Sequence, residues 1–358
     1  MIGSFRLPIS LTSGGTSAPT ILSATVEDAN KDKLVVVFSE VVDITDVTGL
    51  TITGDVTPTL SATTGSGSTT ITFTLSTALT NGQSVTLNVD SSNTIEDPAS
   101  NALLATTKSI TNNVDAPFDT DYQAVLDYAT TNSITLPDSS TQTAQNQIVL
   151  DLKSNDIWSR LDGLLYFKGS AVTAFKLIDW KRLVSAIAFG GVTWSSLGVK
   201  GNATNGYIDT HYILGTDSTN FLFNDASHGA NVFDGTNIGM IMGARDSSGT
   251  PYHTLIGKLS ADSSSLFGRL NAKQNGFTKL DISGNNIFSV DASNIYYHNN
   301  GVLSETTSGG GLGIENWSLY LLSANTGGSA TIYSDMGLGY WFAGNNLSDK
   351  ASVINSIM

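Results

Sequence analysis

The sequence predicts a mainly β fold made of two antiparallel sandwiches, a small one followed by a larger one with a short helical lead-in. Two observations support this prediction. Short runs of β-branched residues, separated by Gly, Asn, Asp and Thr turns, recur along most of the 358 residues. The composition changes at residues 112–117, because aromatic residues are rare before this seam and frequent after it. Domains usually contain about 100–200 residues, so the chain is long enough for two.

The composition excludes several classes of function. Charged residues make up 13% of the chain, roughly half the usual share of about 25%. The net charge of −14 opposes binding to phosphate backbones and anionic membranes, so no nucleic-acid partner is expected. The chain has no cysteine, which excludes disulfides, cysteine zinc sites and a cysteine nucleophile. Its longest apolar run, residues 34–38, is far shorter than the roughly 20 residues of a membrane span, so no membrane insertion is expected.

Residues 1–17 are interpreted as an N-terminal arm. They lack a basic region ahead of an apolar stretch, and Pro8 interrupts the short apolar stretch that is there. A signal peptide is therefore not indicated. The arm is expected either to dock in extended form on a partner subunit or to be a disordered tail.

Residues 18–114 are predicted to form the small sandwich. Apolar and polar residues alternate along short runs, as in strands that bury one face. The clearest runs are residues 21–26, 33–38, 69–75, 84–89 and 106–111. In the third of these, Ile71, Phe73 and Leu75 share one face. Roughly seven short strands in about 100 residues is the pattern of an Ig-like β-sandwich.

Three segments of this module resemble the bacterial Ig-like repeats of surface adhesins. They are Ala18–Ile21, Val37–Asp43 and Ile95–Leu103. Such repeats usually carry a glycine where this chain has Ser100. The resemblance implies a spacer or stalk.

Acidic residues are frequent in the small module, and two interpretations of them stay open. Their oxygen atoms would suit a calcium ion. With no contiguous calcium loop in the sequence, they are otherwise ordinary solvated residues of turns. The residues concerned are Glu27, Asp28, Asp32, Glu40, Asp43 and Asp97.

Two lead-in helices are predicted within residues 119–155. Thr120–Gln123 has the pattern of a capping box, which marks a helix start. The apolar residues that follow at helical spacing are Tyr122, Val125, Leu126 and Ala129. After Pro137, a second helix ending near 154–155 is expected to bury Ala144, Ile148, Val149 and Leu152.

Beyond the helices, residues 117–358 are predicted to form an antiparallel jelly-roll (lectin-like) sandwich. Many short β runs without βαβ alternation favour this architecture. The runs are residues 164–167, 173–178, 207–214, 221–223, 237–242, 254–256, 280–290, 317–322 and 329–333. A last helix is expected at 348–357. Trp158, Trp180, Trp194, Trp317 and Trp341 are expected mainly in the core.

Several segments of this module resemble the concanavalin-A-like and laminin-G-like jelly rolls of bacteriophage virion proteins, especially phages of Bacteroidetes-type hosts. They are Tyr128–Pro137, Asn146–Lys153, Ile157–Asp162, Leu177–Trp180, Gly201–Thr210 and Ile332–Ser348. The resemblance spans nearly the whole module and implies both the fold and a virion context. It leaves the ligand open, because such modules serve as glycan binders, fibre tips and capsid decorations alike.

Catalytic machinery is not indicated. Glycan-cleaving enzymes of this architecture need a pair of carboxylates at a fixed separation. The only glutamates after the seam are Glu305, expected in a loop, and Glu315, and neither has suitable acidic neighbours. The four histidines are far apart in the sequence, so no zinc site is expected. They are His211, His228, His253 and His298. We expect no enzyme activity.

Two loops have the composition of a glycan-binding site. Sugar recognition requires an exposed aromatic ring with hydrogen-bonding neighbours. The first loop offers Asp246, Tyr252 and His253; the second offers Asn294, Tyr296, Tyr297 and His298. Aromatic residues in β modules also serve as core or cross-strand packing, and that alternative stays open. Tyr207 and Asp209 are expected to fix a turn.

The sequence therefore predicts a phage virion structural protein, a head or tail fibre, spike or decoration, that attaches to host surface glycan. Its expected partners are other virion proteins and copies of itself, with a trimer inferred by analogy with fibres. The expected location is the virion surface, after assembly in the host cytoplasm. A purely architectural capsid or tail component and a cell-surface adhesin remain as alternatives.

Overall fold

A computed structural model describes residues 17–234, 239–247, 253–258, 266–270, 275–277, 282–309, 314 and 316–358. The chain divides into two compact units between Pro117 and Phe118, within one residue of the end of the seam. Both units are built mainly of strands, so the predicted mainly β fold is confirmed.

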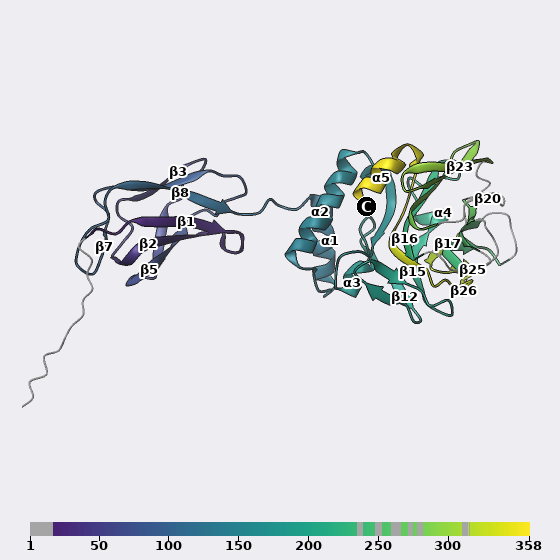
Figure 1. The fold of residues 1–358 in the computed structure, drawn as a ribbon, viewed down its shortest axis with the longest axis horizontal. Helices are drawn as coiled ribbons and strands as arrows, with labels where there is room; N and C mark the ends of the chain where they lie inside the picture. The colour runs from purple at the N-terminus through teal and green to yellow at the C-terminus, as the bar shows by residue number, and fades with distance from the viewer. Residues whose placement is uncertain are drawn as a thin grey trace, which may run out of the picture. The chain divides into compact units, whose positions relative to one another are not determined.

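The smaller unit is a sandwich of short strands (Figure 1). Its strands are β1 (Ile21–Glu27), β2 (Lys33–Ile44), β3 (Leu50–Gly54), β4 (Leu60–Thr64), β5 (Ser68–Leu75), β6 (Val85–Val89), β7 (Ile95–Glu96) and β8 (Thr106–Asn113), with a 3₁₀ turn at Asp28–Asn30. They hydrogen-bond in the order β3-β6-β8-β1-β2-β5-β4, and β7 pairs with β2. Strand β1 joins the two layers, because it pairs antiparallel with β2 and parallel with β8.

The predicted alternation is confirmed in this unit. Ile71, Phe73 and Leu75 are buried in its core, and the threonines between them are only partly covered. Ser100, which stands where related repeats have glycine, adopts φ = +62°. The turn therefore keeps the left-handed backbone that glycine would favour, and the serine carries the strain.

Two helices open the larger unit as predicted, α1 (Thr120–Thr131) and α2 (Ser139–Ser154). The predicted capping box was wrong by one residue. Asp119 caps α1 by accepting a hydrogen bond from the Asp121 N–H at 2.9 Å, and Gln123 instead donates to Asp127. The expected inner face of α1 is confirmed. On α2 the buried residues are Gln145, Val149 and Leu152; Ala144, predicted to be buried, is exposed because the inner face is turned by one position.

Two stacked sheets form the body of the larger unit. The first contains β9 (Leu161–Tyr166), β10 (Ile178–Asp179), β11 (Val184–Ser185), β13 (Thr193–Ser195), β14 (Gly198–Lys200), β16 (Ala226–Asp234), β21 (Gly284–Val290), β22 (Asn294–Asn299), β23 (Val302–Ser308) and β27 (Gly337–Gly344). The second contains β12 (Ile187–Phe189), β15 (Tyr207–Ile213), β17 (Gly239–Arg245), β18 (His253–Lys258), β19 (Leu266–Arg269), β20 (Asn275–Phe277), β24 (Ser318–Leu321), β25 (Ala324–Thr326) and β26 (Ser329–Thr331).

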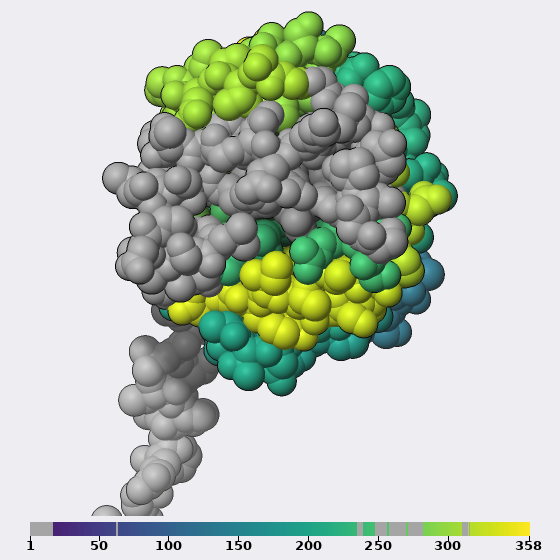
Figure 2. All heavy atoms as spheres, turned by 90° about the vertical axis from the view of Figure 1, so that its right-hand side faces the viewer, coloured from purple at the N-terminus to yellow at the C-terminus, as the bar shows by residue number. Residues whose placement is uncertain are grey.

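The order of strands is not the order of the sequence. The first sheet runs β11-β10-β9-β27-β16-β21-β22-β23, with the β13–β14 hairpin attached to β27. The second runs β12-β15-β24-β17-β18-β19-β20, with β25 attached to β17. Figure 2 shows light green residues near 300 along the top of one face of the unit, and a band of yellow residues from the last part of the chain lower down, with teal residues beneath it.

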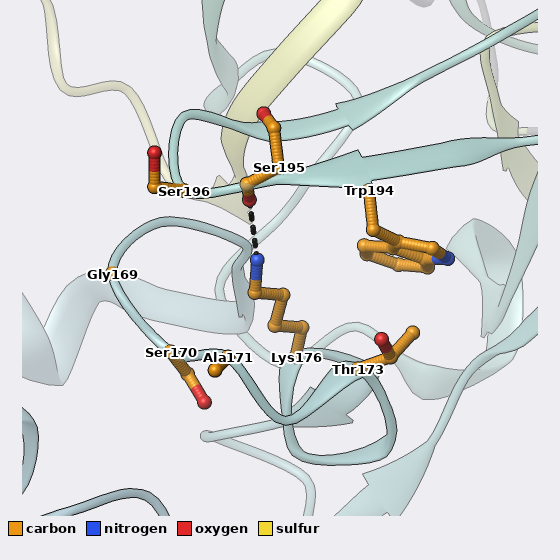
Figure 3. A pocket seen from close by; sticks show the side chains of 8 residues that line it. All are labelled: Gly169, Ser170, Ala171, Thr173, Lys176, Trp194, Ser195 and Ser196. Atoms are coloured by element: carbon orange, nitrogen blue, oxygen red, sulfur yellow. Dashed lines mark hydrogen bonds between the residues drawn. The ribbon is translucent and has the colours of Figure 1, made fainter.

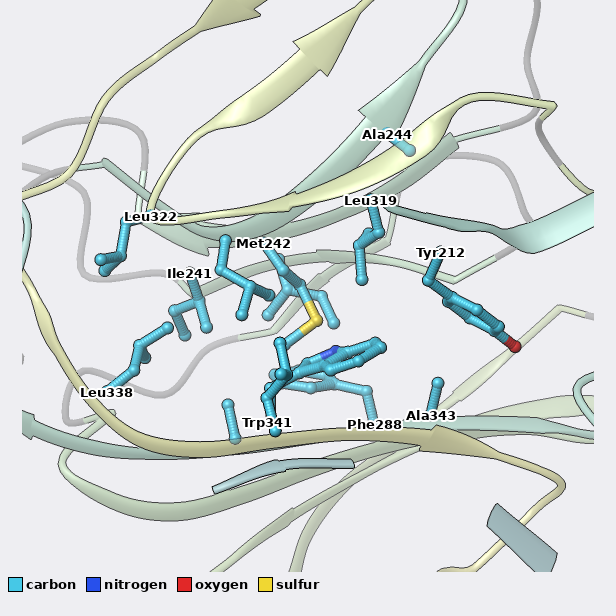
Figure 4. Close-up of a cluster of buried hydrophobic side chains, with 14 of the residues drawn as sticks. Tyr212, Ile241, Met242, Ala244, Phe288, Leu319, Leu322, Leu338, Trp341 and Ala343 are labelled. Atoms are coloured by element: carbon cyan, nitrogen blue, oxygen red, sulfur yellow. The ribbon is translucent and has the colours of Figure 1, made fainter. Parts of the chain in front are cut away.

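The core lies between the sheets. Met242 and Leu319 of the second sheet point toward Trp341 of the first, and Tyr212 flanks them (Figure 4). A second core forms where α1, α2 and the last helix, α5 (Ala351–Ile357), cover the outer face of β9 and β27. The first sheet is thus buried on both faces. Trp158, Trp180 and Trp341 are buried, and Trp194 and Trp317 pack against the core from partly covered positions.

Some predicted elements differ from the structure. Residues 173–178, predicted as one strand, form a single helical turn, α3 (Thr173–Lys176), followed by β10. The predicted strand 221–223 is a turn closed by a bridge between Leu222 and Asp225. The buried Asp162 carboxylate accepts the N–H groups of Asn220 and Phe221, and this turns the chain. The expected terminal helix begins with a 3₁₀ turn, Ser348–Lys350, before α5. Two further short elements were not predicted. A short helix, α4 (Leu214–Asp217), follows β15, and a 3₁₀ turn, Trp158–Arg160, precedes β9.

Candidate functional site

An open pocket of about 290 Å³ lies where the chain leaves β9 and passes the β13–β14 hairpin. Its lining is polar apart from one tryptophan and one alanine. The lining residues are Gly169, Ser170, Ala171, Thr173, Lys176, Trp194, Ser195 and Ser196. Figure 3 shows Lys176 extending between the 169–171 loop and the hairpin, with the Trp194 ring to one side.

Local sequence explains how these residues meet. Gly169 adopts φ = +78°, which lets the chain turn after β9, and its N–H donates to the Ser196 carbonyl at 3.0 Å. The Ser170 hydroxyl then accepts a hydrogen bond from the Val172 N–H. The single turn of α3 follows and buries both Phe175 and Lys176. The loop and the hairpin are therefore held together by backbone contacts.

Lys176 is the cation of this pocket, and it is only 2% exposed. Its Nζ donates to the Ser195 carbonyl at 2.6 Å and lies 5.8 Å from the centre of the Trp194 ring. Burial lowers the pKa of the Lys176 ammonium. Among the residues that the structure describes, no carboxylate forms an ion pair with it. Trp194 is fixed by an edge-to-face contact with Phe167 at 6.1 Å.

A second pocket, of about 260 Å³, adjoins the first at Gly169. Residues of α2 form one side of it, and Tyr166 and Lys168 form the other. Lys168 Nζ donates to the Met358 carbonyl at 2.7 Å and lies 5.3 Å from the centre of the Tyr340 ring, and burial lowers its pKa. Behind this pocket, Asp138 accepts hydrogen bonds from Ser140 and Thr141, which lower the pKa of its carboxyl to about 2.

The second predicted glycan loop is mostly a strand, so its expected exposure was wrong. Residues 294–299 form β22, which pairs with β21 on one side and β23 on the other. Tyr297 is fully buried, stacks on Phe288 at 4.8 Å and donates to Asn286 at 2.8 Å. His298 is 6% exposed, and burial lowers its pKa. Neither ring offers a face to a sugar.

Asn294 and Tyr296 lie at the start of β22 and stabilise a tight turn. The Tyr296 hydroxyl donates to Asp291 at 2.6 Å, and the Asn294 side chain donates to the Tyr296 hydroxyl at 3.3 Å. The hydrogen bond to Asp291 raises the pKa of the Tyr296 hydroxyl. Both residues are partly exposed. Their role in glycan binding stays a prediction.

The first predicted glycan loop begins after β17. Asp246 is partly exposed and follows Arg245, whose backbone pairs with that of His253 at the start of β18. Tyr252 and the side chain of His253 lie outside the part of the chain that the structure describes. Glu305, expected in a loop, lies in β23 opposite Tyr297, and Glu315 is also outside the described residues.

A row of aromatic rings on the second sheet was not foreseen as a unit. Phe189 of β12 stacks on Tyr207 of β15 at 4.8 Å, and Tyr207 stacks on Tyr320 of β24 at the same distance. Because the rings cover one another's faces, the row is cross-strand packing. Tyr207 and Asp209, expected to fix a turn, lie within β15; Asp209 accepts from the N–H of His211, which has φ = +51°, at an irregularity of that strand.

Lys176 and Trp194 are the functional candidates that the sequence reasoning missed. The available signal was a lysine within an otherwise apolar run, Ala174–Ile178. A charged residue inside such a run indicates a buried charge with a specific environment. The pairing with Trp194 had no sequence signal, because the two residues lie on separate segments.

The described residues contain no group of three or more histidine or acidic side chains placed to hold a metal ion. In the small unit, Asp28 forms an ion pair with Lys31 at 3.1 Å, and Asp97 accepts the N–H groups of Ala99 and Asn101. These two predicted calcium ligands thus have partners within the protein. In the described part of the chain, no helix combines the length and apolar character needed to cross a membrane.

Comparison with known proteins identifies the smaller unit. Residues 15–120 match a family model described as bacterial Ig-like domain. The N-terminal resemblance drawn from the sequence is thereby confirmed, and the smaller unit is a bacterial Ig-like domain. No curated protein sequence matches the chain.

Solved structures resemble the chain only in part. The N-terminal part of the bacterial S-layer protein SbsC is 22% identical over 29% of this chain and 27% of that chain, with a TM-score of 0.24. Domain 4 of AbnA, an extracellular arabinanase from Geobacillus stearothermophilus, was solved in complex with arabinotriose. It is 17% identical over 55% of this chain and 98% of that chain, with a TM-score of 0.37. The receptor binding domain of botulinum neurotoxin D is 10% identical over 56% of this chain and 53% of that chain, with a TM-score of 0.33.

The chain spans 27% of the first of these structures and 16% of two longer structures of the same S-layer protein. None of these similarities carries an argument about function.

Proposed function

We propose that this chain is a structural protein of a bacteriophage virion, a fibre, spike or decoration, that holds host surface glycan without cleaving it. The observation that carries the proposal is the open pocket bounded by Lys176 and Trp194. The Ig-like domain serves as a spacer and the larger unit as the attachment module. The virion context extends the resemblance of the larger unit to phage jelly rolls.

The lining of the pocket has the chemistry that sugars require. Trp194 supplies an aromatic surface, and the hydroxyls of Ser170, Thr173 and Ser195 supply hydrogen-bonding groups. None of the lining residues is acidic, so the pocket itself has no carboxylate pair for glycosidic cleavage. The pocket is suited to holding a sugar.

Attachment through so small a pocket would be weak in a single copy. Several copies on one particle would raise the avidity by roughly 10²–10⁴. The proposal therefore includes a homo-oligomer, with a trimer by analogy with fibres, placed at the virion surface among other virion proteins. Imaging of the particle with an antibody against residues 118–358 tests this location; labelling of cell envelopes instead would favour the adhesin.

A glycan array probed with the full chain, displayed in many copies on beads, tests the binding. We expect binding to host surface glycans, and we expect Trp194→Ala to reduce it strongly. Leu197→Ala is the matched control, because Leu197 is 58% exposed in the same hairpin but does not line the pocket. Absence of binding at every copy number would leave the architectural role. Release of sugar fragments from a host polysaccharide would contradict the non-enzymatic role.

A further inference from the structure

Resting on the proposed glycan-binding function, we infer that the pocket around Lys176 selects sugars that carry an anionic group. The anion would accept hydrogen bonds from the Lys176 ammonium while the sugar ring lies against Trp194. Uronic acids and sulfated or phosphorylated sugars share this chemistry, and the test below separates them from neutral sugars.

Lys176 lies in an environment that supplies no counter-charge from the described residues. A buried ammonium is costly unless a negative charge accompanies it. Two other covered cations of this unit have such partners: Arg182 pairs with the fully buried Asp179 at 2.8 Å, and Lys153 pairs with Asp119 and Asp121. Lys168 and Lys181 donate to backbone carbonyls, as Lys176 does, but both are only partly buried. Lys176 has the Ser195 carbonyl, but no ion pair among the described residues. An incoming anion would supply the missing charge.

The sign of the charge reverses locally at the pocket of Lys176. The chain has 31 acidic and 17 basic residues, so most of its surface repels anions. The lining of the two adjoining pockets contains Lys176 and Lys168 and no acidic residue. Asp138 accepts a hydrogen bond from the N–H of Thr141, which lines the second pocket, so a carboxylate stands next to that pocket. The anion is therefore assigned to the pocket of Lys176.

The ammonium of Lys176 and the ring of Trp194 are placed so that one sugar can reach both. Lys176 Nζ lies 5.8 Å from the centre of the Trp194 ring, and both border the same opening. One sugar can thus contact the ring and direct a substituent to the ammonium. Nζ uses one donor on Ser195, and an ammonium has three. Hydrogen bonds between charged groups are roughly twice as strong as neutral ones, so the anion would dominate selectivity.

The test compares acidic and neutral sugars on the full chain. An array carrying uronic-acid, sulfated, phosphorylated and neutral glycans is probed with the bead-displayed protein, followed by affinity measurement on the best ligand and on a neutral form of it, such as the methyl ester of a uronic acid. We expect the anionic form to bind about 10- to 100-fold more tightly. This comparison uses the unaltered protein, so it does not depend on the folding of any variant.

Two substitutions assign the effect to one residue. Lys176→Met is expected to remove the preference for the anionic form, and Lys176→Arg to retain part of it. Lys181→Met is the matched control, because Lys181 is also partly buried against a tryptophan, 4.5 Å from the ring centre of Trp158, but lies outside the pocket. Equal binding of neutral and anionic forms would overturn the inference and leave the proposed function standing. Absence of all sugar binding would overturn both.

Discussion

His228 makes the larger unit sensitive to acid, and the effect can be worked out from its surroundings. The residue lies in β16, in the core between the sheets, with Phe221 at 4.7 Å and Trp341 at 6.1 Å between ring centres. It is fully buried, and burial lowers the pKa of its imidazole to about 3, against a smaller opposing effect of the Phe342 backbone. The neutral ring is compatible with this site, but the charged ring is not.

The size of the effect follows from the two pKa values. An unfolded histidine titrates near about 6.5, so between pH 6.5 and 3 the unfolded state binds more protons than the folded state. The contribution of His228 to stability is complete above pH 6.5 and is lost as the pH falls. Between pH 6.5 and pH 4.5 the free energy of unfolding falls by about 1.4 kcal/mol for each pH unit. The total decrease at pH 4.5 is therefore about 3 kcal/mol. For a unit of this size that corresponds to a lower Tm by roughly 6–12 °C.

Tryptophan fluorescence is the appropriate assay, because all five tryptophans lie after the seam and report only on the larger unit. Urea unfolding of the full chain at pH 7 and pH 4.5 gives the difference in free energy. His228→Leu is expected to remove most of the difference, and a remainder is expected from His298, whose pKa is also lowered by burial. The exposed His211 provides the control variant His211→Asn. Equal pH differences in His228→Leu and the unaltered protein would refute the reasoning.

Three further substitutions test other features. Ser100→Gly is expected to stabilise the Ig-like domain by about 0.5–1 kcal/mol, because relief of the φ = +62° conformation exceeds the entropic cost of glycine; calorimetry would detect it, and a loss of stability would contradict it. Asp162→Asn is expected to destabilise the larger unit by about 2–3 kcal/mol, because an amide cannot accept all the N–H donors that converge there. Faster hydrogen exchange of the Asn220 and Phe221 backbone amides would show that the loss of stability comes from their hydrogen bonds to residue 162. Unchanged exchange at these amides would contradict this explanation. Gly229→Ala is expected to cost about 1–3 kcal/mol, because its new methyl group would lie 2.0 Å from the Phe342 ring; unchanged urea unfolding would show that the ring moves freely.

The local pattern of the sequence was sufficient for many individual elements. The alternation that defines β5 and the apolar spacing that defines α1 are properties of neighbouring residues. β5 matches its predicted range within one residue, and α1 buries the four apolar residues predicted for it. The start of α1 was less certain because Asp119 and Thr120 are both good caps. Contacts with α2 select Asp119: its N–H donates to Asn146, and its carboxylate pairs with Lys153.

Long-range pairing explains most of what the sequence could not provide. Residues 294–299 look like a polar aromatic loop, but strands on both sides cover them in the folded sheet. The candidate pocket depends on a backbone hydrogen bond from Gly169 to Ser196, which joins two segments with no common motif. The segments that resemble phage jelly rolls include neither Lys176 nor Trp194, so the resemblance did not indicate that the two residues lie side by side.

The central position of β27 has a consequence for synthesis of the protein. This strand comprises residues 337–344, yet it lies between β9 and β16 in the middle of its sheet. A nascent chain therefore contains β9 and β16, but not the strand that joins them, until translation has passed residue 344. Truncated products that end before β27 would expose two open strand edges and the underside of the helical layer, which are features that chaperones and proteases recognise. The ribosome must deliver nearly the whole unit before the two halves of this sheet can join.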